Sequence, residues 1–102
     1  MHDGGRLYVV RSGRLATVRA VLINERSWKG ILTYELFLQR TGPSGPAQLS
    51  ESAHVTIDRG RAQTLVQKTV SVTDGDFLFV SLVVREGTHP VDEVYTWREF
   101  EG

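Results

Sequence analysis

Apolar and polar residues alternate along most of this chain with a period of two residues. In one run, Val18, Ala20 and Leu22 take one side while Thr17 and Arg19 take the other. This pattern predicts strands with one buried face, and no window of helical length shows a convincing 3.6-residue repeat. We predict seven strands, over residues 6–11, 14–23, 31–40, 47–57, 63–72, 77–85 and 91–100.

Two of these strands depart from simple alternation. Residues 77–84 are apolar almost throughout, apart from Ser81. They predict a strand in the centre of a sheet, with other chain or a partner over its outer side. Lys68 alternates with Val66 and Val70, which predicts a bulge or a sheet edge and leaves open which side is inward.

Turn signals rich in Gly, Pro, Asn and Asp separate the strands at short, regular intervals, a spacing typical of a sandwich or barrel. A chain of 102 residues can bury one core and is too short for two. We therefore predict an all-β, antiparallel sandwich that forms a single domain over residues 1–102. Residues 1–5 are predicted to be a flexible N-terminal segment.

Charge is balanced over the whole chain but not along it. Twelve basic and twelve acidic residues cancel, which argues against a general nucleic-acid binder. Residues 1–40 carry seven basic residues against three acidic ones, a surplus of four, and the remainder carries the opposite surplus. This distribution predicts a basic side and an acidic side that could steer a charged partner. Ordinary solvated strand faces are the alternative.

The residue types that carry enzyme chemistry are missing or badly placed. The chain has no cysteine, which removes disulfides, thiolate catalysis and cysteine-bound zinc. None of His2, His54 and His89 stands in metal-ligand spacing, and the adjacent Asp92 and Glu93 point to opposite faces of a strand. We expect no enzyme, no metal and no cofactor. No apolar run approaches the roughly 20 residues that span a bilayer, so we expect no membrane insertion.

Three further features have simple structural interpretations. The segment Asp74–Asp76 is predicted to be an Asp/Gly turn and lacks the length of a calcium loop. Trp97 lies within a strand and is predicted to pack in the core. Trp28 lies in a polar loop beside Arg26 and Lys29, so its exposure stays open; exposed aromatic rings beside cations suit protein or sugar binding.

The order of several segments between residues 14 and 97 is similar to that of one family. Tyr34–Gly45 contains a strand and an Arg-x-Gly-x-Ser-Gly turn, and Tyr95–Trp97 belongs to a terminal strand with a tryptophan. Between them, Val70–Asp76 and Val80–Gly87 correspond to a fifth and a sixth strand. In this order the segments resemble the curli chaperone family of CsgC and CsgH.

The resemblance implies an immunoglobulin-like, seven-stranded periplasmic protein that stops curli subunits from assembling into amyloid. Its implied partner is the curli major subunit, and we expect a monomer. The Cys-x-Cys pair of CsgC falls near Gly30 and Leu32 here, so the chain looks like the cysteine-free CsgH branch and has no redox role. The N-terminal residues lack the segments of a signal peptide, so a periplasmic location implies a mature form.

We expect the client to contact a basic sheet face centred on Arg14, Arg19 and Lys68, with Arg61 and Arg85 in support. Exposed arginine contacts of about 0–1 kcal/mol each could disturb a rare nucleus without holding the monomer. The alternative for each side chain is that it keeps the sandwich soluble and blocks edge pairing.

The competing function is a generic adhesion or accessory module that binds a protein or a sugar through its loops. Trp28 and the Gly42–Pro46 turn are the candidates for that role.

Overall fold

The computed structural model describes residues 3–24, 30–56 and 61–101, without the side chain of Arg61. Within these residues the chain forms seven strands and no helix, which confirms the predicted all-β class. Nothing in the described part of the chain forms a helix long and apolar enough to cross a membrane. The strands are β1 (Gly4–Ser12), β2 (Leu15–Asn24), β3 (Ile31–Thr41), β4 (Ala47–Thr56), β5 (Arg61–Ser71), β6 (Phe77–Glu86) and β7 (His89–Glu99).

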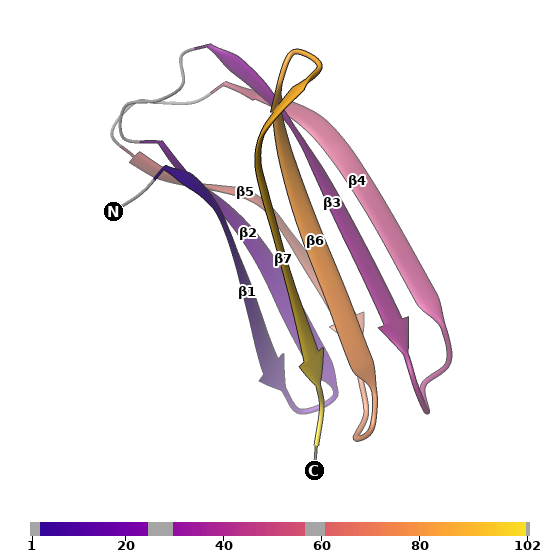
Figure 1. The fold of residues 1–102 in the computed structure, drawn as a ribbon. Coiled ribbons are helices and arrows are strands. Elements are labelled where there is room, and N and C mark those ends of the chain that lie inside the picture. Colours follow the sequence, from indigo (N-terminus) through magenta and orange to yellow (C-terminus); the bar gives the residue numbers. More distant parts are fainter. Residues whose placement is uncertain (1–2, 25–29, 57–60, 102) are drawn as a thin grey trace.

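The strands form two antiparallel sheets, one in the order β1-β2-β5 and the other in the order β4-β3-β6-β7. Figure 1 shows them as two layers of a sandwich, with the three-stranded sheet on one side and the four-stranded sheet on the other. This arrangement confirms the predicted immunoglobulin-like sandwich. The fourth strand pairs with the third, whereas in constant-type immunoglobulin domains it belongs to the other sheet.

The core lies between the layers and follows the predicted alternation. The inward side chains of β2, among them Val18 and Leu22, are fully buried, as are Leu36 and Leu82 from the facing sheet. β6 lies between β3 and β7 and has apolar residues on both faces, as its sequence predicts. Burying a side chain of this size contributes about 1.5–3 kcal/mol, so the inward residues of the alternating pattern provide the main favourable contribution to folding.

The β1–β7 side of the sandwich is closed by polar contacts between the layers. The backbone N–H of Gly5 donates to the carboxylate of Asp92, and Arg98 donates to the carbonyl of Val9 at 3.0 Å. A Cβ on Gly5 would come within 2.8 Å of the Cδ2 of Leu82, so a larger residue would force the buried side chain of Leu82 to move. β1 therefore begins at Gly4, inside the segment that the sequence predicts to be flexible.

The opposite side is bordered by the two edge strands β4 and β5. Lys68 pairs across the ladder with the buried Val18, so its side chain points between the sheets. There its ammonium lies 3.0 Å from the carboxylate of Glu51 on β4. A register shift between Ala20 and Val21 lies close by, so β5 has both the edge position and the irregularity that the sequence predicts.

Two turns at one end of the sandwich are joined through Asp76, whose carboxylate is fully buried. It accepts hydrogen bonds from the backbone and hydroxyl of Ser44 and from the backbone of Thr73. Arg40 donates to the carbonyls of Ser44, Gly45 and Ser71. The Asp/Gly turn predicted here therefore supports the fold.

Candidate protein-binding site

The two sheets differ in charge. Among the strand residues of the three-stranded sheet there is no Asp or Glu, whereas the four-stranded sheet has more acidic than basic positions. The basic residues of the first sheet are Arg6, Arg11, Arg19, Arg61 and Lys68. The second sheet contains Glu35, Glu51, Glu86, Asp92, Glu93 and Glu99 against Arg40, Arg85 and Arg98. The strand residues of the two layers thus differ in charge, but the division does not follow the predicted boundary at residue 40, because β3 belongs to the acidic sheet and β5 to the basic one.

Arg19 lies at the middle of the outer face of the basic sheet. Its guanidinium stacks over the ring of Tyr8 on β1, 5.1 Å from the ring centroid, and Tyr8 is 45% exposed. A shallow hollow lies on each side of this pair, one bordered by Thr17 and Gln67 and the other by Ala62 and Thr64. We call the surface formed by Tyr8, Arg19 and these hollows the Arg19 face.

The five predicted contact residues do not share one face. Arg14 lies exposed in the β1–β2 turn, at the end of the sheet that carries Arg19. Lys68 points to the interior and Arg85 lies on the outer face of the other sheet, where it pairs with Glu35 at 3.1 Å. The side chain of Arg61 lies outside the described residues. Of the four whose side chains the structure describes, only Arg14 and Arg19 belong to the β1–β2 hairpin, and both of these are exposed.

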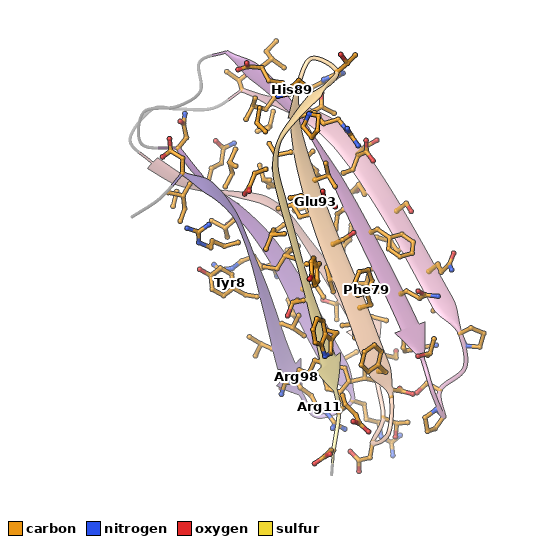
Figure 2. All side chains as sticks on the ribbon, viewed as in Figure 1. Tyr8, Arg11, Phe79, His89, Glu93 and Arg98 are labelled. Carbon is orange, nitrogen blue, oxygen red and sulfur yellow. The ribbon has the colours of Figure 1, made fainter. Side chains whose placement is uncertain are left out.

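Sequence reasoning missed two aromatic groups. Tyr8 alternates in phase with Arg6 and Val10, so the outward pattern of β1 could have identified it. The prediction that Trp97 packs in the core is wrong, because its side chain is 59% exposed on the outer face of β7. Trp28 lies outside the described residues. Figure 2 shows Tyr8 and Phe79 projecting from the two different layers.

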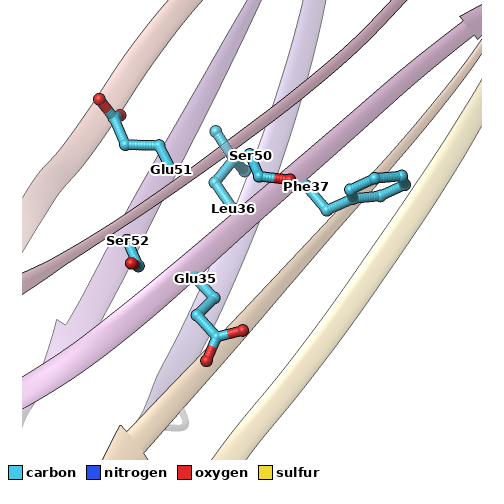
Figure 3. Close-up of a pocket in the computed structure, with 6 residues that line it drawn as sticks. All are labelled: Glu35, Leu36, Phe37, Ser50, Glu51 and Ser52. Carbon is cyan, nitrogen blue, oxygen red and sulfur yellow. The ribbon is translucent and has the colours of Figure 1, made fainter.

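Carboxylates and hydroxyls lie together beside β3 and β4, but they are not arranged for catalysis. Glu35, Ser50 and Ser52 border a shallow hollow there together with Glu51. Figure 3 shows Glu35 and Glu51 projecting to opposite sides of the sheet, so their carboxylates do not converge on one substrate. Among the described residues no group of three or more His, Asp or Glu side chains could hold a metal ion.

Two titratable groups near the core have shifted pKa values that follow from structural contacts. Burial raises the pKa of Tyr34, Glu51 raises it further, and Lys68 opposes both. For Asp76, burial alone would raise the pKa, but hydrogen bonds from Ser44 and Thr73 outweigh it and lower the pKa below the ordinary value. His54 is exposed, and its Nδ1 is hydrogen-bonded to the hydroxyl of Thr33 at 3.0 Å.

Comparison with solved structures gives two matches that cover almost the whole chain. CsgH from R. palustris has a TM-score of 0.68 at 15% identity, over 91% of this chain and 91% of that chain. The curli protein CsgC from E. coli has a TM-score of 0.72 at 11% identity, over 94% of this chain and 97% of that chain. This chain has the fold of CsgH and CsgC. No protein family model matches the sequence, and no curated protein does so either.

The resemblance to CsgH and CsgC inferred from sequence is therefore confirmed at the level of the fold. Because this chain contains no cysteine, the Cys-x-Cys positions assigned to CsgC have no thiol counterpart here. Leu32, at one of these positions, is fully buried in the core, and Gly30 lies just before β3 with a positive φ of 86°. Both residues have structural roles in this sandwich.

Proposed function

We propose that this chain is a periplasmic chaperone that inhibits amyloid nucleation of curli subunits. The observation that carries the proposal is the fold shared with the curli protein CsgC, over 94% of this chain. The client in this proposal is the curli major subunit, and the chaperone acts as a monomer. No reactive group is required, because inhibition needs only contact with a growing nucleus.

The Arg19 face is the surface of this sandwich best suited to such contact. Amyloid grows when unpaired strand edges template one another, so an inhibitor must meet its client without offering a free edge itself. Arg19 is exposed on a sheet without acidic strand residues, and Arg14 is exposed in the β1–β2 turn at the end of that sheet. Their planar guanidinium groups match carboxylates and amides. Each exposed contact contributes about 0–1 kcal/mol. Such weak contacts release a client monomer quickly, so they slow the rare nucleation step without holding the monomer.

Lys68 and Arg85 have different parts in this proposal. The ion pair of Lys68 with Glu51 places charges on the inner sides of β4 and β5, a known protection of sheet edges. Arg85 is held by Glu35 on the acidic sheet. We therefore assign client contact to Arg14 and Arg19, and assign Lys68 to protection of the sandwich's own edges.

The test is the fibrillation of purified curli major subunit with a small molar fraction of this protein present. We expect the lag phase to lengthen well below stoichiometric ratios and the effect to shrink as salt is added, because exposed charge contacts are screened. An accessory module would bind its partner stoichiometrically. An unchanged lag at low salt would therefore refute the chaperone role and favour that alternative.

A further inference from the structure

The outer face of the four-stranded sheet carries a row of aromatic rings that spans three strands. Phe37 on β3 lies 6.4 Å from Phe79 on β6, measured between ring centroids, and Phe79 lies 6.3 Å from Tyr95 on β7. Tyr95 stacks on Trp97 with centroids 6.0 Å apart and ring planes 15° apart. We call these four residues the aromatic row. Figure 2 shows Phe79 projecting from β6.

The β7 end of the aromatic row is open to solvent. Tyr95 is 61% exposed and Trp97 is 59% exposed. Single exposed apolar residues are ordinary on protein surfaces. Here four neighbouring rings lie together on the face opposite to the core, so core packing does not explain them. Contiguous exposed patches of this kind mark interaction surfaces.

Carboxylates stand at both ends of the exposed pair. Alternate residues of a strand share a face, and the residues of β7 that point outward are Glu93, Tyr95, Trp97 and Glu99. At about 3.3 Å per residue this acid–aromatic–aromatic–acid sequence extends over roughly 20 Å. Both glutamates are exposed, and Figure 2 shows Glu93 on the same strand. Glu35 on this face already has Arg85 as its partner.

We propose that this β7 surface binds an extended peptide segment that carries arginine at alternate positions. The charge and the chemistry of the face complement that side chain: a guanidinium stacks on tyrosine and tryptophan rings and binds carboxylates with a planar fork. An extended segment repeats its side chains on one face every two residues, which matches the repeat of β7. Guanidinium groups over Tyr95 and Trp97 would lie within reach of the two flanking carboxylates.

This site is separate from the proposed chaperone surface. The Arg19 face belongs to the other sheet, and its charge has the opposite sign. Binding of an arginine-bearing segment does not require any effect on curli subunits. The two proposals can therefore fail independently.

The test measures binding of a fluorescein-labelled nine-residue peptide with arginine at alternate positions, by fluorescence anisotropy at low salt. The replacement of Tyr95 and Trp97 together by threonine keeps strand-compatible residues at exposed positions. We expect it to weaken binding at least about fivefold. The matched control replaces Tyr8 and Val10, an exposed outward pair on β1, by threonine and should leave affinity unchanged.

A second variant keeps the rings and removes the charges. Glu93→Gln with Glu99→Gln should weaken binding about threefold and reduce its salt dependence. A lysine version of the peptide should bind less tightly, because an ammonium lacks the planar fork. Thermal unfolding of each variant verifies its fold.

Several outcomes would overturn the proposal. The proposal is wrong if the arginine peptide does not bind, or if the lysine peptide binds with the same affinity as the arginine peptide. It is also wrong if replacing Tyr8 and Val10 weakens binding as much as replacing Tyr95 and Trp97. Self-association of the chain that disappears in the Tyr95 and Trp97 variant would also overturn it, since a second copy would then be the occupant.

Discussion

At the scale of single residues, one buried carboxylate joins the two turns at the end of the sandwich. Asp76 is fully buried and holds Ser44 and Thr73 by hydrogen bonds, while Gly42 packs against its backbone. The Arg-x-Gly-x-Ser-Gly turn that resembles CsgC and CsgH therefore has a structural explanation within this chain. Arginine, glycine and serine each make a contact that the neighbouring turn requires.

Gly42 is the more crowded of the two glycines in this turn. Its φ is 120°, and an added Cβ would lie 2.9 Å from both the Cα of Asp76 and the carbonyl oxygen of Gly75. Gly42→Ala should lower the free energy of unfolding by about 2–3 kcal/mol in urea titration. Gly87→Ala is the control, because φ is 62° there and nothing lies within 4 Å, so it should cost only about 1 kcal/mol. Equal losses would show that the close contact with Asp76 is unimportant.

The lowered pKa of Asp76 predicts an acid-dependent stability. A carboxyl whose pKa is lower in the folded state stabilises the fold above its unfolded pKa, about 3.9, and loses this contribution as the pH falls through the folded value. The urea concentration at the unfolding midpoint should therefore decrease once the pH is lower than about 4. Asp76→Asn should lower this midpoint at pH 7 and make it depend less on pH in the acid range. The control is Asp74→Asn, whose carboxylate is 60% exposed on the same turn. An unaltered acid profile for Asp76→Asn would contradict this role.

At the scale of elements, the sequence predicts the strands well and their partners less well. All seven predicted strands occur, because alternation over several residues is a local signal. The burial of Trp97 was mispredicted because β6 and the end of β7 have bulky residues on both faces, and alternation alone cannot tell which face meets the other sheet. The inward position of Lys68 depends on Glu51, a partner from a different strand that no local pattern identifies.

The Lys68–Glu51 pair should matter more for solubility than for stability. Each side chain is 34% exposed, so solvent screening limits the pair, and one oxygen of Glu51 is buried without a hydrogen-bond partner. Replacing Lys68 and Glu51 together by valine should change the free energy of unfolding by less than about 1 kcal/mol. It should also increase self-association in light scattering, because β4 and β5 lose their inward charges.

Gln48 and Gln67 offer a matched control for that variant. Both are exposed on the outer faces of the same two strands, so valine at these positions adds equal apolar surface and keeps the ion pair. This control should remain monomeric. Equal association of both variants would attribute the effect to surface hydrophobicity and contradict edge protection by the pair.

At the scale of the whole molecule, the two layers separate the charge of a chain that is neutral overall. The sequence predicts that charge is distributed unequally along the chain, because counting its basic and acidic residues is sufficient to show it. The assignment of β5 to the sheet of β1 and β2, and of β4 to the other, depends on long-range pairing that counting cannot predict. That assignment is why Arg19 lies on a sheet without acidic strand residues and why Arg85 does not lie beside it.

The central claim is that curli-subunit nucleation is inhibited through exposed charge on the Arg19 face. Its most direct test compares fibrillation lag times for wild type, for Arg14→Gln with Arg19→Gln, and for Gln48→Glu with Ser50→Glu on the other sheet. Both variants lower the net charge by two, and all four positions are exposed. We predict that only the arginine variant loses the salt-sensitive lengthening of the lag. Full inhibition by a folded arginine variant, or equal loss in both variants, would contradict the claim.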